Sequence, residues 1–192
     1  MPPEPLILWL DSYLEAMTRI VIAHEGIVLR FIGDAVLAVF GAPVARTSQA
    51  EIDADASRAV DCALAMGRSL EALNQRWKAE ALPPIVIRIG IHTGPLVAGS
   101  LGGVRHREYS LLGDTANTAA RLEAYAKEVG ERTTTWSQII VGEPTWNAVR
   151  SRLHGTPVGE LMLRGKRNPV RVWLVRDGDP LRDGDPLSGR SP

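Results

Sequence analysis

The chain has 192 residues, of which 45% are hydrophobic and 23% are charged, and its 22 lysine and arginine residues balance its 22 aspartate and glutamate residues. This composition predicts one soluble globular domain with a short extension, and the net charge of zero argues against nucleic-acid binding or attraction to an acidic membrane. The 192 residues contain no apolar run long enough to cross a bilayer and no secretory leader. A single cysteine, Cys62, excludes an internal disulfide, favours a cytoplasmic location and is expected to be a small buried side chain.

The N-terminal part of the chain predicts a helix and a hairpin. Apolar residues recur every three or four positions from residue 6 to residue 21, which predicts an amphipathic helix that ends at Gly26. Two apolar runs follow, 27–32 and 35–40. Only Gly33-Asp34 separates them, and a glycine-first pair between two such runs is typical of a tight β-hairpin.

The remainder of the chain alternates helices with strands. A polar loop to about Ile52 precedes a second helical pattern over residues 60–77, and a third helix is expected to begin near Asp114, a good helix-capping residue. Expected strands lie at 85–91, 109–112, 139–141, 158–163 and 170–175, with a short helix at 144–149. The pattern predicts an α/β fold, as an α+β sandwich, followed by a disordered tail at 177–192.

A carboxylate at the expected hairpin turn is the first candidate for chemistry. Asp34 would lie at the tip of two apolar strands, where a rigid carboxylate can bind a hard cation such as magnesium. Gly-Asp is also common in ordinary turns, and this segment alone favours the turn. The glycine-rich stretch 88–102 resembles a phosphate-cradling loop but lacks the Gly-Lys-Ser or Gly-Lys-Thr of a P-loop. His92 in that stretch has no second ligand at metal-binding spacing, which favours a structural role.

Two further segments carry groups suited to a phosphorylated ligand. In a helix from Asp114, Asn117 and Arg121 fall at i and i+4 on one face, where an amide and a guanidinium can hold a sugar oxygen and neutralise a phosphate. Arg164 and Lys166 lie in a turn that would either clamp a polyphosphate or solvate a hairpin. Taken singly, both segments are better explained as solvated surface.

In this order and spacing, the segments together resemble the catalytic domain of class III adenylate/guanylate cyclases, especially the cyanobacterial-type enzymes linked to sensor domains. The resemblance runs from about residue 5 to residue 175 and is most specific in 31–43, 90–102 and 113–121. It implies a ferredoxin-like cyclase fold over residues 1–176, with a central mixed sheet flanked by helices. It also implies conversion of ATP to 3′,5′-cyclic AMP and pyrophosphate in intracellular signalling.

The resemblance assigns roles to the residues that match the family pattern. Asp34 matches the second of two aspartates that bind two Mg²⁺ or Mn²⁺ ions. Asn117 and Arg121 match the pair that orients the ribose and stabilises the transition state. Family members work as head-to-tail homodimers with the active sites at the interface, so a monomer is expected to be inactive.

The same resemblance places the substrate contacts. Arg30 stands where adenine-specific members carry lysine and guanine-specific members glutamate, and Ser110 stands at the partner base-selecting position. Arg164 and Lys166 lie in the turn that contacts the terminal phosphates. Because a guanidinium donates to the acceptor nitrogens of adenine, ATP is favoured and GTP is the alternative. In the dimer, one subunit would supply Asp34 and its partner Arg30, Ser110, Asn117 and Arg121.

The sequence departs from the family pattern at its N-terminus. The first metal aspartate of the family lies on a strand before the first helix, and here that strand would fall before Met1. Asp11 cannot replace this aspartate, because it lies in the middle of the helix. The chain is either an N-terminally truncated piece of an active enzyme, which the presence of Asn117 and Arg121 favours, or a non-catalytic nucleotide-binding and dimerisation remnant. Any sensor domain or membrane attachment would belong to the parent protein.

Overall fold

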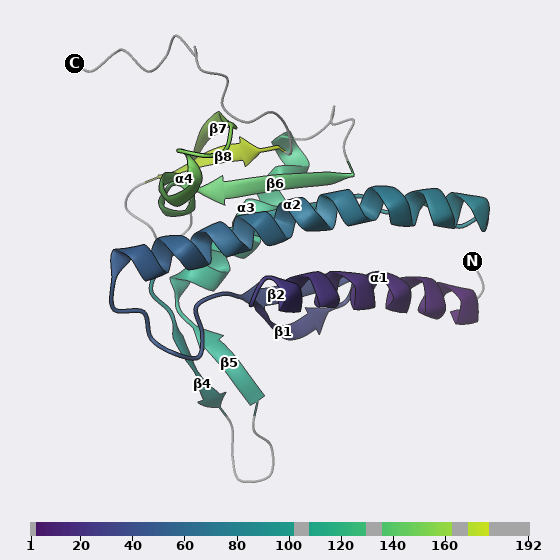
Figure 1. Ribbon diagram of the computed structural model, residues 1–192, viewed down its shortest axis with the longest axis horizontal. Coiled ribbons are helices and arrows are strands. Elements are labelled where there is room, and N and C mark those ends of the chain that lie inside the picture. The colour runs from purple at the N-terminus through teal and green to yellow at the C-terminus, as the bar shows by residue number, and fades with distance from the viewer. Residues whose placement is uncertain (1–2, 102–107, 130–135, 163–168, 177–192) are drawn as a thin grey trace.

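The computed structural model describes residues 3–101, 108–129, 136–162 and 169–176 (Figure 1). The elements in chain order are α1 (Pro3–Ala23), β1 (Ile27–Ile32), β2 (Ala35–Val39), α2 (Gln49–Ala79), β3 (Ile87–Ile91), β4 (Val97–Leu101), β5 (Glu108–Leu112), α3 (Asp114–Val129), β6 (Ser137–Gly142), α4 (Glu143–Val149), β7 (Gly155–Leu161) and β8 (Val170–Val175). The turn with Arg164 and Lys166 and the tail at 177–192 lie outside the described residues.

A central mixed sheet organises the fold. Its order is β3–β6–β8–β7, with β3 and β6 parallel and the other neighbours antiparallel. Side chains along β6 alternate between two layers, because Ile139 and Val141 pack with α2 and α4 whereas Ile140 packs with α3. Helices therefore cover both faces of this sheet, and the predicted α/β fold with a central mixed sheet flanked by helices is confirmed.

Two hairpins lie outside the central sheet. In the first, Ile32 of β1 pairs with Ala35 of β2, and Gly33 between them has a φ of 64°, which glycine adopts without steric penalty. This is the predicted tight hairpin. In the second, β4 pairs antiparallel with β5 and projects away from the helices (Figure 1). Strand β4 occupies residues 97–101 of the glycine-rich stretch 88–102, where no strand was predicted.

Helix α1 packs between the first hairpin and the C-terminal half of α2. Its buried residues Tyr13 and Met17 join Leu70 and Trp77 of α2 in one apolar cluster, against which Val36 of β2 also packs. These contacts come from one face of α1, as expected of the predicted amphipathic helix. They also attach the hairpin to the body of the domain.

Helix α2 begins earlier than the sequence analysis predicted. A polar loop to about Ile52 was expected, but the helix starts at Gln49, directly after Ser48. The Ser48 hydroxyl accepts a hydrogen bond from the Glu51 N–H, and the Glu51 carboxylate accepts one from the Ser48 N–H at 3.0 Å. This capping box supplies partners for the free N–H groups of a helix start and does not depend on apolar spacing.

Two predictions about the chain as a whole can be compared with the structure. None of the helices in the described ranges is long and apolar enough to span a membrane. Cys62 is buried, as predicted, and burial raises the pKa of its thiol to about 12. The thiolate is therefore strongly disfavoured in the folded protein.

Candidate functional site

A groove of about 1330 Å³ lies between the β1–β2 hairpin and the central sheet. Its walls come from β2 and β3, with further residues from α1, α2 and α3. Within the described ranges, β2 pairs only with β1 and β3 pairs only with β6. Each of these two groove-lining strands thus has one edge without a backbone partner, and such an edge can accept a further strand.

Two residues that the sequence analysis assigned to base selection are in contact. Arg30 on β1 donates from Nη2 to the Ser110 Oγ on β5 over 3.3 Å, although the two residues are 80 positions apart. Both side chains are half-buried. A β-bulge between Val28 and Arg30 shifts the register of β1 against β2 just before Arg30, and a bulge of this kind changes where the following side chain points.

Asp34 lies exposed in the hairpin turn. Its charge acts on Tyr13 of α1: burial raises the pKa of the Tyr13 hydroxyl to about 12, and the neighbouring Asp34 carboxylate contributes to this rise. The turn tip therefore lies within electrostatic reach of the groove-lining face of α1. Sequence patterns did not indicate that Tyr13 lies near Asp34, because its spacing in the helix is that of any core residue.

The family's two-metal site can be tested against the donors present. No group of three or more His, Cys, Asp or Glu side chains suited to a metal ion occurs among the described residues. Magnesium is commonly held by one or two carboxylates together with substrate phosphates and waters. Asp34 fits one such carboxylate, so the site would need the nucleotide and a second carboxylate to hold two ions.

Helix α3 carries the predicted amide and guanidinium. It begins at Asp114, which lies in the first helical turn rather than before it. Asn117 is exposed and Arg121 half-buried, and the i, i+4 spacing puts them on the same side of the helix. Next to them, Ala116, Ala119 and Ala120 line the groove.

The placement of α3 rests on a close approach to β3. A Cβ at Gly90 would lie within 3.0 Å of three backbone atoms of α3, in Ala119, Leu122 and Glu123. At the start of the helix, the Thr115 hydroxyl donates to the Pro95 carbonyl over 2.6 Å. These two contacts hold the first half of α3 against β3 and the segment that follows it.

His92 follows β3 and is half-buried. Its ring packs against Gly142, where a side chain would collide with Nδ1. This packing agrees with the structural role favoured for His92.

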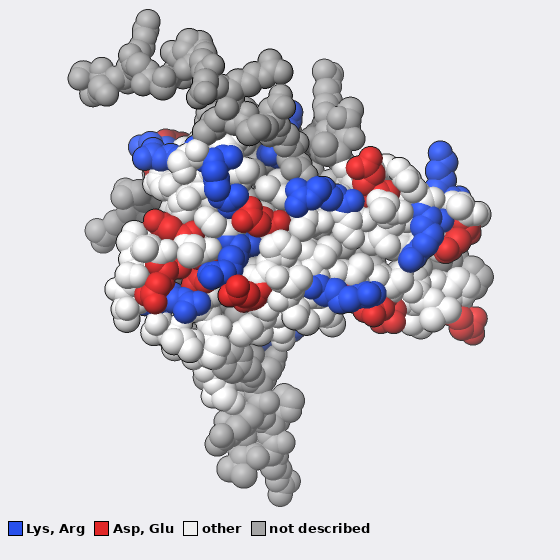
Figure 2. Space-filling view, in the orientation of Figure 1, with Lys and Arg blue, Asp and Glu red and all other residues white. Residues whose placement is uncertain are grey.

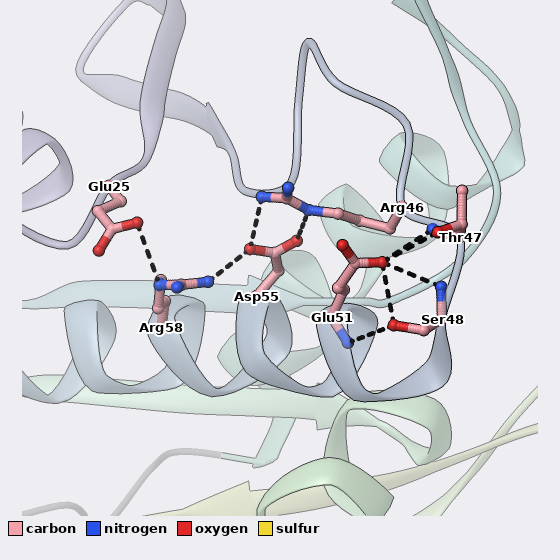
Figure 3. Close-up of polar contacts among 7 residues, drawn as sticks. All are labelled: Glu25, Arg46, Thr47, Ser48, Glu51, Asp55 and Arg58. Carbon is pink, nitrogen blue, oxygen red and sulfur yellow. Dashed lines mark hydrogen bonds and ion pairs between the residues drawn. The ribbon is translucent and has the colours of Figure 1, made fainter.

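A group of charged residues at the base of the first hairpin was not predicted from the sequence. Asp55 on α2 is only 7% exposed and contacts two arginines, Arg46 and Arg58 (Figure 3). A signal was present, since Asp55 and Arg58 are at i and i+3, but such pairs are common on solvated helices. Elsewhere, on the face in Figure 2, Lys and Arg residues are interspersed with Asp and Glu residues.

Comparison with known proteins defines the class of this fold. The structure superposes on the adenylyl cyclase CyaB from P. aeruginosa with a TM-score of 0.80 and 26% identity, covering 93% of this chain and 86% of that one. A guanylyl cyclase structure gives a TM-score of 0.77 at 31% identity, covering 91% of this chain and 82% of that one. The fold is therefore that of class III cyclase domains.

The sequence comparisons identify the family. The profile of the adenylate and guanylate cyclase catalytic domain matches residues 2–176. Adenylate cyclase 1 of Rhizobium meliloti (strain 1021) is 41% identical over 173 residues, which are 90% of this chain and 24% of that protein. The chain belongs to the adenylate and guanylate cyclase catalytic domain family. It spans about a quarter of the length of the curated relatives it matches.

Proposed function

We propose that this domain converts ATP to 3′,5′-cyclic AMP and pyrophosphate, acting as a head-to-tail homodimer. The observation that carries the proposal is the 3.3 Å contact between Arg30 and Ser110, which joins the two base-selecting candidates within one protomer. It supports the expectation that both residues face the same nucleotide base. Family membership supplies the reaction class.

The choice of ATP over GTP follows from donor and acceptor chemistry. A guanidinium has five N–H donors and no acceptor, so Arg30 can donate to acceptor nitrogens of adenine. It cannot accept hydrogen bonds from the N1 and amino groups of guanine. The Ser110 hydroxyl accepts from Arg30 and, as a hydroxyl, can also donate one hydrogen bond.

The remaining residues act on the sugar and the phosphates. The Asn117 amide would hold a ribose oxygen, and the Arg121 guanidinium would stabilise the charge that develops on the α-phosphate as the 3′-oxygen attacks it. Asp34 would hold a divalent cation, which when bound neutralises phosphate charge and activates the 3′-hydroxyl. Pyrophosphate is the leaving group. Positioning and charge neutralisation provide the catalysis.

A dimer is supported by the apolar residues near the proposed site. Phe31 and Ile32 at the end of β1 are 49% and 60% exposed, and Val97 and Leu112, which pair across the second hairpin, are 66% and 51% exposed. Exposed apolar groups of this kind commonly mark protein–protein interfaces. A partner protomer would cover them and would bring its Asn117 and Arg121 toward this chain's Asp34.

The groove lies where a strand that the sequence analysis expected before the first helix could pair with β2 and β3. A strand laid between β2 and β3 would pair with the two edges that have no backbone partner in the described part of the chain, and it would join the first hairpin to the central sheet. We propose that the working enzyme has such a strand, from a segment outside these 192 residues, and that it carries the second metal-binding carboxylate. The isolated 192 residues would then bind metal weakly.

The proposal is tested on the protein extended at its N-terminus to include the preceding segment. Incubation with Mn²⁺ and either ATP or GTP, followed by mass spectrometry, is expected to yield cyclic AMP in preference to cyclic GMP. Arg30→Glu is expected to shift the preference toward GTP, because a carboxylate accepts from guanine. Arg76→Glu, an exposed change on α2, is the control and should leave the preference unchanged.

Three results would contradict all or part of the proposal. Formation of neither cyclic nucleotide by the extended protein would reject catalysis, and tight ATP binding without product would favour the non-catalytic alternative. Cyclic GMP as the main product would keep the enzyme class and reverse the base preference.

A further inference from the structure

The two ends of the β1–β2 hairpin are held close to α2. Gly26, just before β1, packs so tightly that a Cβ there would lie 2.7 Å from the ring of Phe40, just after β2. Gly41 has a φ of 80°, and a Cβ there would lie 2.5 Å from Oδ2 of Asp55. The exit of the hairpin therefore lies directly against a buried carboxylate of α2.

That carboxylate is the centre of an ion-pair network. Arg46, in the loop after β2, donates from Nε to Asp55 Oδ2 over 2.6 Å and from Nη2 to Oδ1 over 3.2 Å. Arg58 donates from Nη1 to Oδ1 over 2.8 Å, and its Nε lies 3.4 Å from the carboxylate of Glu25, in the turn before β1 (Figure 3). The network thus joins both ends of the hairpin to one point on α2.

The network acts beside any strand that pairs with the edge of β2, because it holds the ends of the hairpin rather than its edge. In the described ranges, β1 and β2 pair with each other and with no strand of the central sheet. Packing of α1 holds the hairpin through apolar contacts, which are not directional. The paired hydrogen bonds from Arg46 to a carboxylate are directional and define one geometry.

We infer that Asp55 is a positioning residue, which through Arg46 and Arg58 fixes the hairpin so that Arg30 meets Ser110 and Asp34 is presented to substrate. This inference rests on the proposed function only for its consequence in catalysis, since the anchoring itself is a property of the fold. Asp55 lines the groove from α2 and is not among the residues assigned to metal or substrate binding. Its side chain is 10% exposed, so its carboxylate is largely shielded from solvent, whereas the side chains of Arg46 and Arg58 are 34% and 37% exposed.

The test compares two aspartates of the same helix. Asp55→Asn removes the charge at the anchor with little change of shape. Asp61→Asn is the matched control, because Asp61 also accepts from an arginine, Arg152 at 2.7 Å, but on the side of α2 toward α4 rather than the hairpin. Asp55→Asn loses its pairs with Arg46 and Arg58, whereas Asp61→Asn loses its pair with Arg152, and only the first change would release the hairpin.

The first readout is hydrogen exchange and needs no activity. In Asp55→Asn, the amides of residues 27–40 are expected to exchange at least about tenfold faster than in the wild type, while amides of β6 keep their protection. Asp61→Asn should leave residues 27–40 unchanged. Equal protection of the hairpin in wild type and Asp55→Asn would overturn the anchoring.

The second readout is the ratio of kcat/KM for ATP to that for GTP, in the N-terminally extended protein. Partial unfolding lowers both values equally and leaves the ratio unchanged, whereas a displaced Arg30 lowers the ratio. We expect Asp55→Asn to reduce it by about threefold or more and Asp55→Glu to restore part of it. Faster hairpin exchange with an unchanged ratio would limit Asp55 to stabilising the fold and would overturn the positioning role.

Failure of the proposed function and failure of the anchoring give different results. If the wild type makes no cyclic nucleotide, the proposed function fails, while the exchange experiment still decides the anchoring. If Asp55→Asn does not fold, Arg46→Lys takes its place, because it keeps the charge and the Asp55–Arg58 pair but loses the two-pronged contact. Unchanged exchange and an unchanged ratio in Arg46→Lys would then overturn the inference.

Discussion

Replacing Gly90 by alanine would test whether the close approach of β3 and α3 supports the site. The added methyl carbon would lie within 3.0 Å of backbone atoms in Ala119, Leu122 and Glu123, whereas ordinary contacts begin at 3.4 Å. Because these are backbone atoms, no side-chain rotation relieves the overlap. The helix must move away from the strand by a distance on the order of 1 Å.

The expected magnitude follows from the cost of overpacking, typically about 1–3 kcal/mol. With backbone on the far side, we expect the upper end, about 3 kcal/mol. For a protein of this size, 1 kcal/mol shifts Tm by about 2–4 °C, which predicts a fall of roughly 6–12 °C. Since α3 carries Asn117 and Arg121, a misplacement of about 1 Å is expected to lower kcat by up to about 100-fold.

The assay is thermal unfolding with a matched glycine. Gly99 on β4 also lies in a strand, but a Cβ there meets nothing within 4 Å. Gly99→Ala is therefore expected to leave Tm unchanged or slightly raised, since alanine reduces the entropy of the unfolded chain. If Gly90→Ala and Gly99→Ala have the same Tm, the packing argument for the placement of α3 is refuted.

Three further predictions concern separate parts of the molecule. Asn74→Ala is expected to lower stability by about 2 kcal/mol in urea unfolding, because the buried Asn74 amide bonds both the N–H and the carbonyl of Ile85; Gln75→Ala, an exposed neighbour, should change little. Burial raises the pKa of Cys62 from 9.0 to about 12, so as the pH rises the thiol ionises in the unfolded chain before it ionises in the folded protein. The stability that the buried neutral thiol contributes is complete below pH 9 and falls as the pH rises from 9 toward 12. Urea unfolding between pH 8 and pH 10 should therefore show a shallower decline in Cys62→Ala, and identical slopes would contradict the assignment. In the extended enzyme, Arg121→Ala should lower kcat far more than it weakens ATP binding, and equal losses would argue against a transition-state role.

The sequence predicted the first hairpin well because its turn chemistry is local. Two apolar runs separated by Gly33-Asp34 leave a two-residue turn as the simplest connection, and the pairing of Ile32 with Ala35 follows from it. The core strands were predicted for a similar reason. Residues 139–141 are apolar at every position because both faces of β6 are covered by helices.

Contacts between distant segments were less accessible to sequence reasoning. The capping box at Ser48 and Glu51 is a local signature that an argument from apolar spacing overlooks. Because of it, α2 begins at Gln49, where a polar loop to about Ile52 was expected. The Arg46–Asp55 pair depends on a loop returning to the helix, which no spacing rule encodes. For the site, the sequence indicated Arg30 and Ser110 separately, and only the fold brings them into contact.

The geometry gives a physical reason why an arginine suits position 30. The side chain starts on β1 and must reach Ser110 on β5, and its Nη2 accomplishes this over 3.3 Å. A guanidinium that donates one hydrogen bond to a hydroxyl still presents its remaining donors in a fixed plane, whereas an ammonium is a point charge whose donors rotate. Orientation of the donor plane by Ser110 would therefore tie base recognition to the relative position of β1 and β5. Under the inferred anchoring to α2, that position would depend on the charge network at the base of the hairpin, which would then influence which nucleotide is accepted.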